Sequence, residues 1–432
     1  MPRCKKRSGT KGGGGGGGAR YGVESVCSED DCASEARSHC SSASEVTNAT
    51  EDVGGETTDE HANQEDVEDK LKDFIESTLD KSVKIRLAAL EGLRSALSRK
   101  NLYDFLTERR VTLTDSLERC LKKGKGEEQA LAAVVATLLV VQLGANSEGE
   151  ECFRTLQPVL TSILVNASAS AHSRQSCATA LAMCCYISDG MEELVATMKC
   201  LEAVFSAAYP SAGSPAPAPS PALQALRCAA LLGWALLLTI CPASRDIIAS
   251  HLPKLPALLS SDNVNMRIAA GEAIALLFEL AHEADADFQY VGVEELCDKL
   301  KDLATDGNKS RAKTDRRKQR AIFRDVLKAV EEGEAPSETI RFGPECIYVD
   351  SWLRKRTYDA FKDALGSGVR LHLQENELLR DIFELGPPLL LDPSMLKTTK
   401  ISRFERHMFN SATFKARTKA RSKMRDKRAD VV

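Results

Sequence analysis

Aromatic residues are scarce in this chain of 432 residues: they make up 5% of it, with only two tryptophans. Long apolar runs are also missing. The longest, 130–141 and 228–241, fall short of the roughly 18 to 20 apolar residues that a membrane-spanning helix needs. A secretory signal is not expected either, because the basic residues in 1–7 precede a glycine run instead of an apolar segment. We therefore expect a protein inside the cell with no membrane partner.

Catalytic signatures are missing as well. Outside the seven consecutive glycines at 12–18 there is no GxGxxG, and no GxxxxGK[ST], HExxH or GxSxG occurs anywhere. The seven histidines are scattered, with no recurrent cysteine or carboxylate partner. The segment 366–368 (Gly-Ser-Gly) is more typical of a helix terminus than of a phosphate-binding loop. We expect no catalytic residues, no cofactor and no small-molecule substrate.

The fourteen cysteines do not form a recognisable framework. Several of them fall inside apolar helical patterns: Cys177, Cys184, Cys185, Cys228 and Cys241. In a reducing compartment such cysteines behave as small apolar core residues. Cys27, Cys32 and Cys40 lie close together in a polar segment, but they lack the paired CxxC spacing of a zinc site. We therefore expect neither disulfides nor a metal site.

Two compositional zones divide most of the chain. Residues 1–64 combine the glycine run with a stretch rich in Ser, Glu, Asp and Thr, which cannot bury enough apolar surface to fold. We expect a disordered acidic leader there. From 65 to 335, apolar residues recur every three or four positions, which predicts helix after helix.

The helical zone repeats itself. Residues 82–93 align without gaps to 263–274, and weaker copies of the same frame recur between them. The equivalent positions are Arg86, Gln129, Arg174, Arg227 and Arg267, which are 43, 45, 53 and 40 residues apart. This is the period of HEAT and armadillo repeats, and the long step contains a Pro/Ala/Ser-rich insert at 209–221. The prediction is an all-α, HEAT/armadillo-like α-solenoid of about five helical pairs, in which the marker arginines bind within or between repeats.

The character of the sequence changes after residue 335. Residues 339–349 read as two short extended segments around a Gly-Pro turn, 349–384 reads as helix, and Gly386-Pro-Pro ends it. We expect residues 336–392 to form a small, mainly helical cap on the solenoid, followed by a basic helical tail over 393–432.

Charge is strongly polarised along the chain. Residues 397–432 carry 12 lysines and arginines against three acidic residues, although the whole chain has a net charge of −4. The cations of this tail are Lys397, Lys400, Arg403, Arg406, Lys415, Arg417, Lys419, Arg421, Lys423, Arg425, Lys427 and Arg428. Interspersed among them are Phe404, His407, Phe409 and Phe414. Rings between cations suit single-stranded nucleic acid, since bases stack on the rings while lysine and arginine meet phosphates.

A second basic feature precedes the cap. On a helical wheel, Lys313, Arg316, Arg317, Arg320 and Arg324 share one stripe beside an apolar face that includes Phe323 and Val326. Five cations on one stripe repel one another, and an anionic partner would relieve this. We expect RNA more than DNA, because no helix-turn-helix, zinc-finger or zipper pattern is present. A solvated face for the stripe, and a nuclear import signal for the tail, remain open alternatives.

Several segments resemble the interferon-related developmental regulators over about residues 65–430. These segments are 117–125, 265–272, 303–309, 383–388, 400–406, 414–423 and 425–430. The resemblance implies an armadillo-like fold and two roles. One is association with translationally inactive ribosomes, in which the basic C-terminal helix occupies the mRNA path. The other is transcriptional co-regulation during differentiation.

The expected function is therefore binding without catalysis. The first hypothesis is a translation regulator in the cytoplasm, whose partners are the ribosome and its rRNA and whose tail excludes mRNA. The alternative is a nuclear scaffold that binds regulatory proteins along the solenoid surface and uses the tail only for import.

Overall fold

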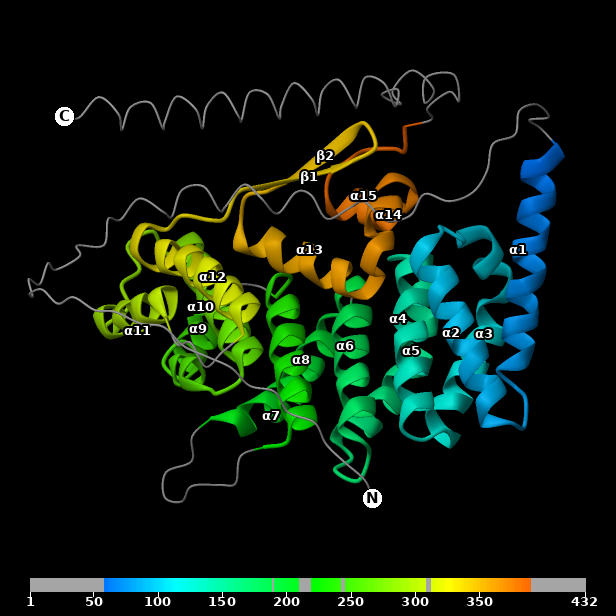
Figure 1. The fold of residues 1–432 in the computed structure, drawn as a ribbon, viewed down its shortest axis with the longest axis horizontal. Coiled ribbons are helices and arrows are strands. Elements are labelled where there is room, and N and C mark those ends of the chain that lie inside the picture. The colour runs from blue at the N-terminus through cyan, green and yellow to red at the C-terminus, as the bar shows by residue number, and fades with distance from the viewer. Residues whose placement is uncertain (1–57, 189, 210–218, 242–244, 308–311, 390–432) are drawn as a thin grey trace, which may run out of the picture. The chain divides into compact units, whose positions relative to one another are not determined.

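The structure is a computed structural model that describes residues 58–188, 190–209, 219–241, 245–307 and 312–389 (Figure 1). Helices dominate these ranges. The first six are α1 (Thr58–Ser77), α2 (Val83–Arg99), α3 (Tyr103–Lys123), α4 (Glu127–Leu143), α5 (Ser147–Val165) and α6 (Ala171–Ile187). The next are α7 (Met191–Phe205), the 3₁₀ turn η1 (Ser206–Ala208), α8 (Pro221–Leu238), α9 (Arg245–His251), the 3₁₀ segment η2 (Leu255–Ser260), α10 (Val264–Ala284), α11 (Val293–Thr305) and α12 (Lys313–Glu332).

Two layers of helices make up the repeats. The even-numbered helices from α2 to α12 stack one on the next, and α3, α5 and α7 stack beside them as a second layer. Each of the five marker positions lies near the start of an even-numbered helix, α2, α4, α6, α8 or α10. The predicted α-solenoid and its repeat frame are thus confirmed, and α11 with α12 adds a further pair that the sequence frame did not mark.

The even-numbered helices are the core of the solenoid. Buried residues occur almost all round α4 and α10, whereas helices such as α3 and α11 are buried along one side only. The helix α8 is the one described helix that is long and apolar enough to cross a membrane. It packs against α6, α7 and α10, and 56% of it is buried inside the solenoid.

Two glycines set the spacing between even-numbered helices. A Cβ atom at Gly233 of α8 would lie 2.8 Å from the Cβ of Ala182 on α6. One at Gly271 of α10 would lie 2.7 Å from the ring of Phe323 on α12. Side chains at these two positions would push neighbouring helices apart.

Two of the marker arginines bind across repeats, as expected. Arg86 of α2 donates from Nε and Nη2 to the two carboxylate oxygens of Glu128 on α4, at 2.6 and 2.9 Å. Arg267 of α10 donates to Oε1 of Gln319 on α12. Arg174 instead holds the end of the preceding helix through the carbonyl of Leu164, at 2.8 Å.

The predicted extended segments form a hairpin. Strand β1 (Glu338–Phe342) pairs antiparallel with β2 (Glu345–Val349), and Gly343, with φ of 53°, lies in the turn. Three helices follow: α13 (Trp352–Leu365), α14 (Val369–Glu375) and α15 (Glu377–Ile382), with the 3₁₀ turn η3 (Gly366–Gly368) between the first two. Gly366, with φ of 57°, ends α13, which confirms the reading of 366–368 as a helix terminus.

The C-terminal helices lie along the side of the solenoid. Residues 352–382, which we call the strap, run back along the even-numbered helices from α10 to α2 (Figure 1). At one end Glu279 of α10 accepts the backbone N–H groups of Trp352 and Leu353, at 2.7 and 2.9 Å. At the other end the strap contacts α2 and α4. The predicted hairpin and the mainly helical segment on the solenoid are therefore present, and the segment covers the even-numbered helices.

Two buried polar side chains fasten the far end of the strap. His372 of α14 contacts the carbonyl of Leu97 on α2 through Nε2, at 3.2 Å. Asn376 donates to the carbonyl of Val141 on α4, at 3.1 Å, and caps α15 by accepting the N–H of Leu379. Both side chains are almost fully buried, so these bonds hold the strap without competition from water.

The boundaries at the N-terminal side also differ slightly from expectation. α1 begins at Thr58, inside the segment that we predicted as leader; residues 1–57 lie outside the described ranges, as does 210–218 within the predicted insert. The first four residues of α1, 58–61, are polar in sequence (Thr-Asp-Glu-His). A polar first turn of this kind carries no apolar period to reveal it.

Candidate nucleic-acid interface

The helix α12 carries the described part of the predicted RNA-binding surface. It packs on α10 and α11 through Phe323, Val326 and Val330, all of which are buried. Gly333, with φ of 70°, ends the helix in the left-handed conformation that favours glycine. The apolar side predicted from the sequence is therefore the side that holds α12 in the solenoid.

A polar contact fixes the rotation of α12. The amide of Gln319, which is 1% exposed, accepts two bonds from Arg267 through Oε1, at 3.1 and 2.6 Å. Its Nε2 donates to the carbonyl of Leu303 at 3.2 Å and to the carboxylate of Asp306 at 3.3 Å. The side chain of Gln319 thus joins α12 to α10 and to the end of α11. These bonds fix the rotation of α12 and therefore the direction in which the basic stripe faces.

The five predicted cations occur together on α12, as the helical wheel requires. Lys313 and Arg324 are exposed, whereas Arg316, Arg317 and Arg320 are half-buried. Among the residues that the structure describes, Lys313, Arg320 and Arg324 have no carboxylate within the 4.0 Å of an ion pair. Buried neighbours hold the stems of the arginines while most of the charge stays uncompensated.

Acidic residues delimit this surface. Towards the C-terminus of α12, Glu331 pairs with Lys301 of α11 at 2.7 Å, and Lys328 pairs with Glu334 at 3.2 Å. The unpaired cations are confined to the first three turns, 313–324. A surface of this size could meet a few phosphates, but it is not by itself an extended nucleic-acid groove.

The remaining sixteen predicted RNA-binding residues belong to the tail and lie outside the described residues. The same holds for Cys27, Cys32 and Cys40. The stripe of α12 and the tail therefore stay separate predictions, and no geometry joins them.

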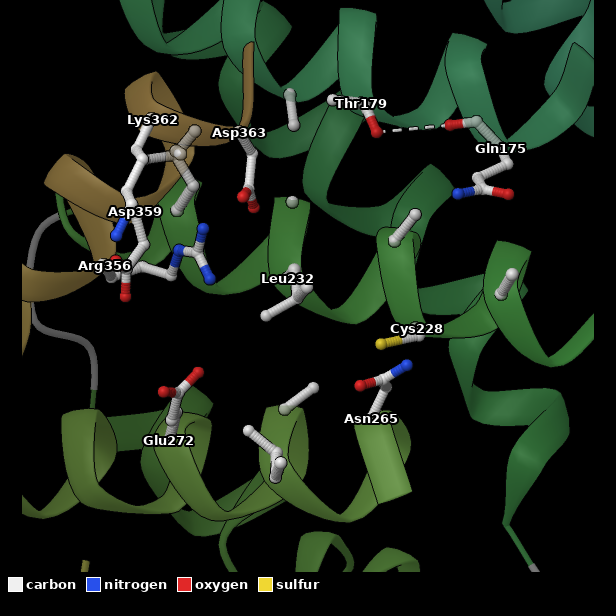
Figure 2. A pocket seen from close by; sticks show the side chains of 18 of the residues that line it. Gln175, Thr179, Cys228, Leu232, Asn265, Glu272, Arg356, Asp359, Lys362 and Asp363 are labelled. Atoms are coloured by element: carbon white, nitrogen blue, oxygen red, sulfur yellow. Dashed lines mark hydrogen bonds between the residues drawn. The ribbon is translucent and has the colours of Figure 1, made fainter. Parts of the chain in front are cut away.

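A groove lies between the even-numbered helices and the strap (Figure 2). Its volume is about 720 Å³, and α4, α6, α8, α10, α12 and α13 contribute its walls. The middle is lined by small and apolar side chains such as Ala229 and Leu232. None of the five stripe residues lines it, although Lys318 and Ile322 of α12 do.

The strap lines the groove with charged residues. Lys355 pairs with Glu272 of α10 at 3.3 Å and with Asp359 at 2.5 Å. Burial alone would lower the pKa of Lys355, but the two carboxylates outweigh it and the pKa is raised. Burial raises the pKa of Asp363, which the nearby charge of Arg356 partly offsets.

Nothing in the described residues amounts to a metal centre, since no group of three or more His, Cys, Asp or Glu residues could hold an ion. The cysteines of the apolar helical patterns are free, and most are buried, as predicted; Cys241 is half-buried. Burial raises the pKa of Cys177 to about 12 and that of Cys228 to about 11. Thiols of this kind are largely protonated near neutral pH and are poor nucleophiles.

Sequence reasoning missed the groove and its charged residues. Arg354, Lys355 and Arg356 are consecutive cations, a visible signal, but their different roles depend on contacts with α10 and with Glu384. Arg356 is buried and lines the groove, whereas Arg354 pairs with Glu384 at 2.8 Å.

Comparison with known proteins gives consistent matches over nearly the whole chain. Residues 36–331 match the family model "Interferon-related developmental regulator", and residues 376–429 match "Interferon-related protein conserved region". Human interferon-related developmental regulator 1 is 56% identical over 407 residues, which cover 94% of this chain and 90% of that protein. Mouse interferon-related developmental regulator 2 is also 56% identical, over 402 residues, 92% of this chain and 91% of that one.

A solved structure also resembles the fold. An archaeal HEAT-like repeat protein from Thermococcus onnurineus NA1 aligns to 62% of this chain and 92% of its own, with a TM-score of 0.37 and 16% identity. Because that score is low, the description of the fold rests on the helical layers themselves.

Proposed function

Because this chain belongs to the interferon-related developmental regulator family, we propose that it is a non-enzymatic translation regulator that binds the ribosome through ribosomal RNA. The solenoid docks on the ribosome, and the basic tail enters the mRNA path and excludes mRNA. In this role the protein acts in the cytoplasm. It needs no cofactor, because binding alone blocks the mRNA path.

One feature supports this proposal: the excess of cations at the C-terminal side of an otherwise acidic sequence. The last 36 residues hold nine more basic than acidic residues. Lys415, Lys419, Lys423 and Lys427 are four apart, so a helical tail would bring like charges together, at a cost of about 0.2 to 0.5 kcal/mol for each pair in water. When phosphates surround the tail, their attraction to the lysines outweighs this repulsion between like charges.

The stripe of α12 supports a second rRNA contact. Its unpaired cations are carried on a helix whose rotation Gln319 fixes, so they need little reorganisation to meet phosphates. Phosphate contacts of this kind position a protein on RNA without reading its sequence. A defined site on the ribosome therefore depends on the shape of the rRNA surface that the solenoid meets.

Transcriptional co-regulation is the second candidate function. The groove between the strap and the even-numbered helices favours it, since a protein partner needs such a recessed surface with polar ends and an apolar middle. The tail cations would then serve an import receptor, and a nuclear pool would exist beside the cytoplasmic one.

Salt dependence distinguishes these two modes. We expect the affinity of the full chain for purified ribosomes, measured by co-sedimentation, to fall by about 10³ to 10⁵ between 50 and 200 mM salt if 6 to 10 phosphates are contacted. Ribosome binding that hardly changes over this range would argue against rRNA as the main partner.

A further inference from the structure

Arg356 is an anomaly in the groove. Its residue is 8% exposed, its Nε has no hydrogen-bond partner, and in the described ranges no carboxylate approaches it within 4.0 Å. The other two most buried arginines differ: Arg267 is bonded to Gln319, and Arg380 pairs with Glu345 at 2.8 Å. Its Nη groups face the groove, and a guanidinium that is always charged and has no carboxylate partner there can bind an anion that enters.

The guanidinium is directed into the groove. Figure 2 shows it extending from α13 towards Leu232 in the middle of the cavity, with Glu272 and Asp363 on either side. It is therefore accessible to a molecule that binds in the groove. A carboxylate or a phosphate is the group that the planar fork of an arginine binds best.

The charges around Arg356 favour an anion with a single charge. The groove is lined by four cations, Lys318, Lys355, Arg356 and Lys362, and by three carboxylates, those of Glu272, Asp359 and Asp363. Lys355 is already engaged by Glu272 and Asp359. One positive charge is left over, which one carboxylate would neutralise. A phosphate dianion, or a run of RNA phosphates, would meet three carboxylates at close range.

The far end of the groove offers amide groups. Gln175 of α6 and Asn265 of α10 lie at the end opposite to Arg356 in Figure 2, and no hydrogen bond engages either side-chain amide in the described structure. A carboxamide can donate to and accept from a peptide backbone. Ala229, Leu232 and Ile268 also line the groove and form its apolar floor, and Leu232 lies between the two ends in Figure 2. The cavity of about 720 Å³ is far larger than a lone ion requires.

We propose that this groove binds a short acidic segment of a protein partner. One aspartate or glutamate of that segment pairs with Arg356, its neighbouring side chains cover the apolar floor, and its backbone reaches Gln175 and Asn265. Partner binding at this site is independent of the stripe on α12 and of the basic tail. Ribosome binding and peptide binding can therefore fail separately.

The test begins with a random library of twelve-residue peptides selected on the full chain. We expect enriched peptides that share one acidic position next to apolar residues. A fluorescent copy of the strongest peptide should then lose at least tenfold in affinity when its acidic residue is replaced by the matching amide, measured by fluorescence polarisation. Enrichment of no peptide, or of peptides without a common acidic position, would overturn the proposal.

Protein variants assign the binding to Arg356. Arg356→Met removes an unpaired buried charge, so the fold should be kept while the affinity for the peptide falls at least tenfold. Arg341→Gln, which removes an exposed cation on β1 outside the groove, is the matched control and should bind normally. Equal binding by Arg356→Met and the unchanged protein would refute the site.

One more protein variant and one more peptide variant complete the test. Ala229→Trp fills the apolar floor without touching Arg356 and should also abolish binding; it replaces Arg356→Met should that variant fail to fold. A copy of the peptide with phosphoserine at the acidic position should bind more weakly than the carboxylate. Tighter binding of the phosphorylated copy would overturn the assignment to a singly charged group and indicate a phosphopeptide site instead.

Discussion

The contact between Arg86 and Glu128 illustrates how single side chains register one repeat on the next. The carboxylate of Glu128 is 3% exposed, and the guanidinium meets it with two parallel bonds. Arg86 also donates to the carbonyls of Asp80 and Lys81, which lie in the loop before α2. If one partner of this ion pair is removed, the other is left as an uncompensated charge, which destabilises the fold.

We predict that Glu128→Ala lowers the free energy of unfolding by about 2 kcal/mol, because it leaves the guanidinium of Arg86 without its carboxylate. Urea unfolding followed by circular dichroism measures this. The double variant Arg86→Met with Glu128→Leu should recover most of the loss, since both charges are then gone. If the double variant loses as much as the single one, the ion pair is not what Glu128 contributes.

His372 should make the docking of the strap sensitive to pH. Burial lowers its pKa below the value of 6.5 expected in the unfolded chain, although contacts with the carbonyls of Leu97 and Ser98 oppose this. The unfolded state therefore binds the proton more readily, and stability should fall as the pH drops from about 6.5 through the lowered pKa.

Hydrogen exchange of α14 at pH 7.5 and pH 5.5 checks this expectation. Exchange of residues 369–375, corrected for its intrinsic pH dependence, should be faster relative to α10 at the lower pH. His372→Gln keeps a donor for Leu97 but cannot take up a proton, so it should flatten the difference. An unchanged pH effect in this variant would assign it to another group, such as the buried His251.

At the scale of elements, the strap marks the limit of what the sequence predicted. Periodicity and the Gly-Pro turn were sufficient for the hairpin and for α13, since these depend on neighbours in the chain. Their position was not predictable in the same way. It depends on contacts such as that between His372 and Leu97, 275 residues apart, which no local spacing reveals.

The two parts of the candidate site, the stripe of α12 and the groove, also differ in whether the sequence could predict them. The stripe of α12 was predictable, because five cations at helical spacing must share a face wherever the helix lies. The groove was not, since its walls come from six helices spread between Val134 and Asp363. Burial turns Arg356 from one of three consecutive cations into an isolated charge, and burial is a property of the assembled fold.

Gly368 provides a direct test of how the strap is fastened. A Cβ atom at this position would lie 1.7 Å from the carbonyl oxygen of Ser98 on α2, so the backbone of the strap must shift to accommodate alanine. We predict that Gly368→Ala lowers the free energy of unfolding by ~2 kcal/mol and speeds hydrogen exchange over 352–382. Ser367→Ala, at the exposed neighbouring residue, should change neither; equal effects of the two variants would contradict the close contact.

Charge reversal on α12 tests the proposed second rRNA contact. Arg320→Glu with Arg324→Glu should weaken ribosome binding by about tenfold or more and reduce the salt slope by about 2, since each lost phosphate contact removes roughly one unit. The matched control is Lys72→Glu with Arg94→Glu, which reverses two exposed cations on α1 and α2. If control and test variants bind alike, the stripe is only a solvated face.

At the scale of the molecule, charge is separated along the sequence. Residues 1–396 carry 13 more acidic than basic residues, whereas 397–432 carry nine more basic ones. An acidic body is repelled by rRNA at long range, so ribosome binding must depend on the regions where cations are concentrated. The tail, with the largest such excess, is expected to dominate the affinity.

Sedimentation of a cell lysate through a sucrose gradient tests this most directly, comparing the full chain with a chain that ends at Asp392. At low salt the full chain should travel with ribosomes and the shortened chain should stay near the top, while moderate salt should release part of the full chain. A shortened chain that still sediments with ribosomes, or a full chain that never does, would contradict the account.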